Sequence, residues 1–433
     1  MVSLNGTHDP ARKSWVESAN EEECDFPIQN LPFGIFRSDT GPPRGGIAIG
    51  DQILDIPVLI ATGLLEGQAA DAAQTAAGPT LNPLMALGNG AASALRASVS
   101  DLLSQGAPQQ AAVKACLVPM NRVTMELPAD IRHFTDFLCS YEHTQRLSVD
   151  GTLPPAFSSV PIAYNSRAST VRVSGTPFIR PNGQYMSDDA EISFGPEPRQ
   201  DFELELGFYV GPGNDIGKPI SIKDAPDQIF GYCLLNDWSA RGIQFWQSRP
   251  LGPFLGKSSM TSVSPWVITA EALLPFATEA RLRENDIAPP AYLSSPEVAQ
   301  SGGIDIRMFA DWLPRELGEK GQSAVNITDT NFKFMHWTPA QMLAHHASNG
   351  CSLLPGDLLG SGTVSGPTDE TRACLAEITE RGSVTVDVGG TQRVWLEDGD
   401  EVIFRARAEA DGYVPIGFGE CRGIIEPAVK WPS

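Results

Sequence analysis

The chain has 433 residues, enough for one large or two ordinary domains with an ample core. Its 41 glycines and 35 prolines favour a globular protein built from strands and turns over an array of helical repeats. A net charge of −21 argues against a general nucleic-acid or anionic-membrane surface, so neither is expected as a partner.

The sequence shows neither a cysteine pattern for disulfides or metal nor a segment for secretion or membrane insertion. The seven cysteines are scattered and form no CxxC pair, which indicates ordinary buried thiols in a reducing compartment. No apolar run approaches the ~18 residues that would span a bilayer, and the N-terminus lacks the apolar centre of a secretory signal. A cytoplasmic location is the expectation.

The first third of the chain predicts a leader and a small module. Residues 1–24 are polar and end in EEECD, which predicts a mobile leader. Residues 25–130 predict an α+β module that opens with two short strands around the Gly50-Asp51 turn. The Ala/Leu-rich residues 58–117 follow with helical spacing.

Residues 131–433 predict a β-rich catalytic domain. Short strands alternate with Gly and Pro, as in VRVSGTPFIRPNGQ and SVTVDVGGTQRVWLEDGDEVIFRARA. A helix is predicted from Thr338 as N-cap and Pro339 at the first position to Gly350. The fold class is therefore mixed α+β and β-rich.

The stretch 201–261 carries the clearest sign of a site. In DFELELGFYV, apolar residues alternate with Glu203 and Glu205, which places both carboxylates on one strand face ~6.5–7 Å apart. A second apolar strand ends in Asp237 and is followed by Arg241, Gln244 and Lys257. A bound cation would relieve the repulsion between the carboxylates, and a solvated strand face is the ordinary alternative.

Two further residues suggest acid–base chemistry. The segment TDFLCSYEHTQRL predicts a helix that begins at Asp136 and places His143 two turns along the same face, as a metal ligand and a base. Glu377 interrupts an apolar stretch that predicts a strand, where it either faces solvent or orients a histidine. A plain N-cap and a packed histidine are the alternatives for Asp136 and His143.

Other motifs carry no function. The loop GPGNDIGKP lacks the spacing of a phosphate loop and predicts a turn. Neither GxGxxG after a strand nor GxSxG occurs, which argues against a dinucleotide site and an α/β-hydrolase triad. His345 and His346 are expected to be structural because no acidic or cysteine partner lies at ligand spacing.

At these residues the sequence resembles the fumarylacetoacetate hydrolase family. The blocks that carry the resemblance extend over nearly the whole chain after the leader: DFPIQNLPFGIF, GIAIGDQILDI, SGTPFIRP, NDWSAR, PLGPFLGKS, GCSLLPGDLLGSGTVSG, LEDGDEV and GYVPIGFGEC. The resemblance implies an SH3-like N-terminal barrel module, a C-terminal mixed β-roll and a homodimer. It also implies metal-dependent hydrolysis of a C–C bond in a 1,3-diketone acid, with fumarylacetoacetate, from tyrosine and phenylalanine catabolism, as the default substrate.

The resemblance further implies roles for individual residues. It implies a site for a cation, Ca²⁺ or Mg²⁺, at these residues: Asp136, Glu203, Glu205, Asp237, Lys257 and Thr261. His143 corresponds to the catalytic base and Glu377 to its carboxylate partner. The groups that would stabilise the carbanion are Arg241, Gln244 and Lys257. Gln244, Thr363 and Tyr164 correspond to substrate contacts.

The sequence departs from the family where substrate would bind. Leu138 and Ser248 stand where tyrosines are expected, and the arginine expected soon after the histidine has no clear match, which leaves Arg146, Arg167 and Arg249 as candidates. Two enzymatic hypotheses stay open: a hydrolase of fumarylacetoacetate, or a paralogue that hydrolyses, decarboxylates, isomerises or condenses another β-diketone or β-keto substrate. A third hypothesis, a non-catalytic scaffold, conflicts with the presence of both His143 and Glu377.

Overall fold

The computed structural model describes residues 2–38, 41–148, 150–282 and 288–432. Within those ranges β-strands dominate, as predicted, and most of the helices are short. No helix in this described part has the length and apolar character needed to cross a membrane.

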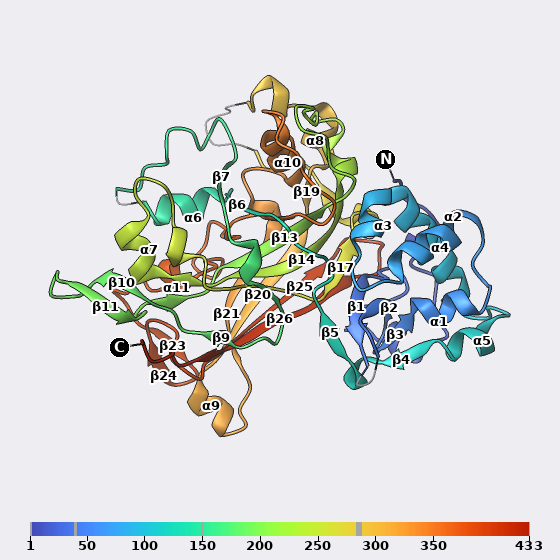
Figure 1. The fold of residues 1–433 in the computed structure, drawn as a ribbon, viewed down its shortest axis with the longest axis horizontal. Helices are drawn as coiled ribbons and strands as arrows, with labels where there is room; N and C mark the ends of the chain where they lie inside the picture. The colour runs from blue at the N-terminus through green and yellow to red at the C-terminus, as the bar shows by residue number, and fades with distance from the viewer. Residues whose placement is uncertain (1, 39–40, 149, 283–287, 433) are drawn as a thin grey trace.

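A large sheet forms the centre of the molecule (Figure 1). In the described residues it has 13 strands, ten of them in the path β4-β3-β2-β1-β17-β14-β13-β22-β6-β7. Their bounds in that order are β4 (Leu117–Pro119), β3 (Gln52–Asp55), β2 (Arg44–Ile49), β1 (Phe33–Arg37), β17 (Trp266–Thr269), β14 (Ile229–Asp237), β13 (Leu204–Val210), β22 (Leu358–Gly360), β6 (Phe134–Leu138) and β7 (Ile162–Asn165). Beside this path lie β5 (Thr124–Glu126), β8 (Val171–Val173) and β16 (Thr261–Val263).

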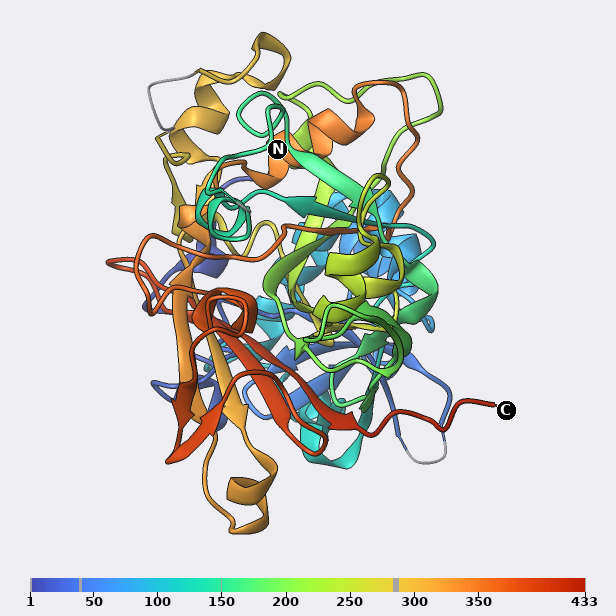
Figure 2. The ribbon, with the colours of Figure 1, turned by 90° about the vertical axis from the view of Figure 1, so that its left-hand side faces the viewer.

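A second sheet packs against the first, and all of its strands but one are drawn in orange and red in Figures 1 and 2. Its order is β21 (Val325–Asn331), β20 (Ile306–Leu313), β25 (Glu401–Ala408), β26 (Ile416–Glu426) and β9 (Phe178–Ile179). The remaining described strands form pairs: β10 (Asn182–Met186) with β11 (Ile192–Pro196), β12 (Gln200–Asp201) with β15 (Ser239–Ala240), β18 (Ala277–Thr278) with β19 (Gly303–Ile304), and β23 (Val386–Val388) with β24 (Thr391–Arg393). Side chains such as Phe202, Phe404 and Trp238 fill the core between the two sheets.

The helices form two groups along the chain. Five pack on the N-terminal strands, at the right of Figure 1: α1 (Ile56–Ala61), α2 (Gly67–Ala76), α3 (Asn82–Leu87), α4 (Asn89–Leu103) and α5 (Gln110–Lys114). The others are α6 (Tyr141–Arg146), α7 (Arg241–Gln247), α8 (Pro296–Ser301), α9 (Arg315–Glu319), α10 (Pro339–Ala347) and α11 (Leu375–Ile378). Helix α10 begins as predicted, because the Thr338 side chain caps it and Gln341 completes a capping box.

The N-terminal module shares the large sheet with the rest of the chain. The predicted hairpin at residues 47–54 is confirmed as β2 and β3, with Ile47 opposite Leu54. Strand β1 then pairs with β17, so that Phe33 lies opposite Val267. An SH3-like barrel and a boundary at residues 130–131 stay predictions, and the backbone hydrogen bonding continues across the two parts.

The leader predicted at residues 1–24 contacts distant parts of the chain in its described residues, while Met1 lies outside them. His8 is buried, and its Nε2 donates to the Glu271 carbonyl oxygen at 2.9 Å. Thr7 accepts a hydrogen bond from Arg96, and the Trp15 indole donates to the Leu102 carbonyl oxygen at 2.9 Å. The polar composition suggested disorder, but these polar groups are satisfied by contacts with distant parts of the chain.

Candidate active site

Three carboxylates converge where neighbouring strands of the large sheet meet. Asp136 lies in β6, Glu205 in β13 and Asp237 at the end of β14. The predicted helix at Asp136 is therefore wrong: strand pairing with β22 places Asp136 beside Gly360. A Cβ at position 360 would come within 2.6 Å of Asp136 Oδ1 and 3.0 Å of Glu205 Oε2, so the absence of a side chain there makes room for both carboxylates.

The geometry of this group fits a hard cation. One oxygen from each of Asp136, Glu205 and Asp237 lies within 4.8 Å of the other two, and all three residues are buried. Among the described residues, Asp136 Oδ1 and Glu205 Oε1 have no hydrogen-bond partner. Buried carboxylate oxygens are normally paired, and an all-oxygen set of this kind suits Ca²⁺ or Mg²⁺ better than a thiophilic metal.

Electrostatics also favour a cation here. Burial, and next the charge of Asp237, raises the pKa of Asp136 well above its ordinary value. Burial, and next Asp136, raises the pKa of Glu205 in the same way. These shifts show that the protein alone does not offset the charge of the cluster, and a divalent cation would do so.

Glu203 borders the three carboxylates, because Lys257 Nζ bonds both Glu203 and Asp237 of the cluster. It precedes β13, and it is paired with Lys257 Nζ and with Arg241, whose Nη2 lies 2.8 Å from Glu203 Oε1. Burial would raise the pKa of Glu203, but the charges of Lys257 and Arg241 outweigh burial and lower it. Lys257 also donates to Asp237 Oδ2 at 2.8 Å, and Thr261 Oγ1 donates to Asp237 Oδ1 at 3.3 Å.

Helix α7 supplies the other groups that were predicted to stabilise negative charge. Arg241 begins this helix, and its Nη1 donates to Gln244 Oε1 at 3.0 Å. Its Nε donates to Asp201 at 2.8 Å. Ser248 caps the C-terminus of α7, one turn after Gln244. The cations Arg241 and Lys257 are buried and anchored by carboxylates, so their positions are fixed before any ligand binds.

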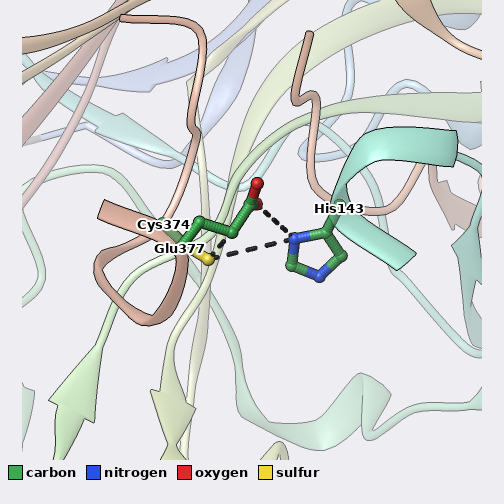
Figure 3. A group of neighbouring side chains, drawn as sticks. All are labelled: His143, Cys374 and Glu377. Atoms are coloured by element: carbon green, nitrogen blue, oxygen red, sulfur yellow. Dashed lines mark hydrogen bonds and ion pairs between the residues drawn. The ribbon is translucent and has the colours of Figure 1, made fainter. Parts of the chain in front are cut away.

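A histidine and a glutamate from two separate short helices face each other (Figure 3). His143 lies in the short helix α6, which Ser140 caps, and Glu377 lies in α11 in place of the predicted strand. Their side chains meet, with His143 Nδ1 at 2.5 Å from Glu377 Oε1. Burial would raise the pKa of Glu377. The charge of His143 and the hydrogen bonds that Glu377 accepts outweigh burial, and they lower this pKa to about 2. Glu377 is thus an anion, and Nδ1 carries the proton between them.

The other ring nitrogen of His143 points toward Glu203, at the border of the carboxylate cluster. Nε2 lies 3.7 Å from Glu203 Oε1 and 3.3 Å from Thr363 Oγ1. In a neutral imidazole whose Nδ1–H donates to Glu377, the Nε2 lone pair is free on the side of Glu203. The pair therefore presents a base to whatever binds beside the cluster.

The predicted substrate contacts divide into those that reach the site and those that do not. The Tyr164 hydroxyl lies 2.7 Å from Asp136 Oδ2 and 2.8 Å from Asp237 Oδ2, and burial raises its pKa well above the ordinary value. Leu138 ends β6 and shares a strand face with Asp136. Arg146 Nη1 bonds Glu377 Oε2 at 2.9 Å, whereas Arg167 Nε bonds Ser169.

Three residues that hold the site were missed from the sequence. Asp201 accepts hydrogen bonds from Arg241 Nε and from the backbone N–H groups of Leu375 and Ala376, so it connects α7 to α11. Ser365 donates to Glu377 Oε1 at 2.6 Å. Cys374 Sγ lies 3.5 Å from the same oxygen. Asp201 opens the DFELE motif, which was a usable signal, but nothing local marks Ser365 or Cys374.

Taken together, a buried carboxylate cluster for a cation, an oriented histidine base and fixed cations define an enzyme that activates water beside a metal site. Family models match both parts of the chain: "Fumarylacetoacetase N-terminal" over residues 29–128 and "Fumarylacetoacetate (FAA) hydrolase C-terminal" over residues 132–425. The chain belongs to the fumarylacetoacetate hydrolase family, as the sequence blocks predicted.

Relatives that carry a name align with nearly the whole length of this chain. A fumarylacetoacetase of Oryza sativa subsp. japonica is 42% identical, over 98% of this chain and 99% of that protein. The fumarylacetoacetase of Homo sapiens is 42% identical, over 94% of this chain and 98% of that protein.

Solved structures support the fold. A fumarylacetoacetate hydrolase from Exiguobacterium antarcticum superimposes with a TM-score of 0.51 at 14% identity, over 92% of this chain and 99% of that one. A maleylpyruvate hydrolase from Sphingobium gives 0.50 at 17% identity, over 92% and 100%.

Proposed function

We propose that this enzyme hydrolyses fumarylacetoacetate to fumarate and acetoacetate. The observation that carries the proposal is the His143–Glu377 pair. Nε2 of His143 faces Glu203, which is paired with Arg241 and with Lys257, and Lys257 also bonds Asp237 of the carboxylate cluster. The full-length relatives named above supply the substrate, and they do not favour a paralogue that acts on another β-keto compound.

We assign the cation site to Asp136, Glu205 and Asp237, with Glu203 and Thr261 beside them. Ca²⁺ and Mg²⁺ are the proposed ions because every donor is a hard oxygen. When bound, the cation supplies Lewis-acid polarisation to a substrate carbonyl. Lys257 is charged, since the carboxylates of Asp237 and Glu203 outweigh burial and raise its pKa, so it acts as a hydrogen-bond donor and not as a ligand.

His143 starts the reaction by taking a proton from water at Nε2. The hydroxide adds to the carbonyl carbon on the fumaryl side, and Glu377 stabilises the imidazolium that forms. The bond between this carbon and the adjacent methylene then breaks, and its electron pair leaves on the acetoacetate fragment as an enolate. Lys257, Arg241 and Gln244 are placed to stabilise that enolate, and the proton on Nε2 returns to the leaving carbon.

Other expectations continue as proposals. A homodimer is supported by exposed apolar side chains next to α7, since Leu251 is 96% exposed and Phe254 is 70% exposed. A small diketo acid as the partner, in place of nucleic acid or a membrane, is supported by the net charge of −21. A cytoplasmic location is supported by seven free cysteines.

The test of the proposed function is the ultraviolet loss of the diketone chromophore of fumarylacetoacetate. We expect turnover that EDTA abolishes and that added Ca²⁺ or Mg²⁺ restores. His143→Ala should lose turnover, whereas the matched control His345→Ala should keep it, because His345 contacts Tyr292 outside the site. A folded, metal-loaded wild type without turnover would refute the assignment.

A further inference from the structure

The histidine–glutamate pair has a third member whose chemistry the hydrolysis does not use. Cys374 Sγ lies 3.9 Å from His143 Nδ1 and 3.5 Å from Glu377 Oε1, as Figure 3 shows. All three residues are buried, and their three ligand atoms lie within 4.8 Å of one another. We propose that His143, Cys374 and Glu377 form a second metal site, selective for thiophilic ions such as Zn²⁺ or Cd²⁺, and that its occupation inhibits the enzyme.

The distances are close to those that a tetrahedral ion needs. With metal–sulfur bonds of about 2.3 Å and metal–nitrogen or metal–oxygen bonds of about 2.0 Å, the sulfur should lie about 3.5 Å from each of the other two ligands. The structure has 3.9 and 3.5 Å. Only the 2.5 Å between Nδ1 and Oε1 must open, to about 3.3 Å, which rotation of the Glu377 side chain can supply.

The charge balance also permits the exchange. With a neutral imidazole and a thiol, this group holds one proton on Nδ1, one proton on Sγ and one negative charge on Glu377. When a divalent ion binds, the Sγ proton leaves to solvent and the proton on Nδ1 is replaced by one on Nε2, so the ion neutralises the single negative charge of the buried group. No oxidant or reductant is needed, because the ion takes the place of the protons on Nδ1 and Sγ while the carboxylate remains an anion.

The ligand types separate this site from the carboxylate cluster. Asp136, Glu205 and Asp237 offer only hard oxygens, whereas the second group offers a thiolate and an imidazole, which favour Zn²⁺ and Cd²⁺ over Ca²⁺ and Mg²⁺. Excess Mg²⁺ should therefore not protect the second site.

Inhibition follows because an ion bound to Nδ1 of His143 changes what Nε2 of the same ring can do. An imidazole bound to an ion through Nδ1 remains neutral only if it carries its proton on Nε2. Nε2 then donates a hydrogen bond and no longer accepts a proton from water. This consequence rests on the proposed function of His143 as the base, whereas the binding of the ion does not.

The test uses Cd²⁺ with the full chain in excess Mg²⁺ and without substrate, because a cadmium–thiolate bond absorbs in the ultraviolet. Cys24 and Cys351, the two thiols that are not buried, are first replaced by serine. In this background we expect a thiolate band that saturates at about one Cd²⁺ per chain. Cys374→Ser should remove the band, and the matched control Cys421→Ser, another buried thiol, should keep it. No band, or a band that persists in Cys374→Ser, would overturn the site.

Inhibition is measured separately, as the Zn²⁺ concentration that halves turnover in excess Mg²⁺. Cys374→Ser should require at least about tenfold more Zn²⁺ than its parent, each relative to its own uninhibited rate. Equal sensitivity would overturn the inhibitory function and place the inhibition at the oxygen cluster. A protein without turnover that still shows the Cys374-dependent band would refute the hydrolase assignment and retain the metal site.

Discussion

The charge of Glu377 is the feature of the site whose contribution is most directly measurable. Its pKa is lowered from an ordinary 4.5 to about 2, which corresponds to about 3 kcal/mol in favour of the charged carboxylate. Because the folded pKa lies below the unfolded one, this stabilisation is present above about pH 4.5 and is lost as the pH falls toward 2. The largest favourable contribution comes from His143, followed by the hydrogen bonds from His143, Ser365 and Arg146.

Glu377→Gln removes this charge and keeps the shape of the side chain. The amide oxygen can still accept from His143 Nδ1, so the tautomer is preserved while the imidazolium loses its counter-charge. The full 3 kcal/mol would correspond to a loss of roughly 200-fold, and since Ser365 and Arg146 share that energy we expect kcat to fall about 100-fold. KM should change less than about threefold, because Glu377 is not expected to contact substrate.

The assay is the loss of the diketone chromophore at saturating Mg²⁺, with a thermal melt of each variant. The matched control is Glu142→Gln, a buried glutamate next to His143 in α6 whose carboxylate pairs with Arg281 at 2.7 Å. Its kcat should stay within about threefold of wild type. A folded Glu377→Gln protein that keeps more than a fifth of wild-type kcat would refute the argument that the charge of Glu377 stabilises the imidazolium.

Three other changes test the cation site and the substrate contacts. Adding Ca²⁺ or Mg²⁺ to the metal-free protein should raise Tm more at pH 8 than at pH 6: the raised pKa values of Asp136 and Glu205 mean that the metal-free fold loses stability as the pH rises. Gly360→Ala should weaken cation binding at least about tenfold in a calorimetric titration, because its Cβ would meet Asp136 Oδ1 at 2.6 Å. Leu138→Tyr should lower KM for fumarylacetoacetate about 2- to 10-fold, the range of one added hydrogen bond.

Each of these expectations has a contrary result. An equal rise in Tm at both pH values would mean that the two carboxylates are not the groups that the cation relieves. Unchanged affinity in Gly360→Ala would show that the carboxylates tolerate the methyl group without losing their geometry. An unchanged or higher KM in Leu138→Tyr would show that this strand face does not contact substrate.

Local sequence patterns were sufficient for the strands that carry Glu205 and Asp237. In both, an apolar run of strand length ends near charged residues, and the structure confirms β13 and β14. The same reasoning failed for Asp136 and Glu377. The segment TDFLCSYEHTQRL contains both a strand and a helix, and the break at Ser140 is marked only by that residue acting as N-cap. The four residues of α11 are too few to show a helical period.

The positions that no local pattern reveals are those set by distant contacts. Glu203 was grouped with the cation ligands from its spacing to Glu205, whereas its contacts with Lys257 and Arg241 depend on residues that follow β14. His8 was placed in a mobile leader, and its burial depends on Glu271, 263 residues away. Such contacts become visible only when the chain is folded.

The pairing of β1 with β17 has a consequence for how the molecule comes apart. Because the strand edge of the N-terminal module is hydrogen-bonded to the sheet that carries the carboxylates, neither part can melt without exposing backbone groups of the other. The buried pair of Arg96 and Glu271, 3.2 Å apart, ties the same two parts through their side chains. We expect one cooperative calorimetric transition for the whole chain, shifted as a unit when the cation binds.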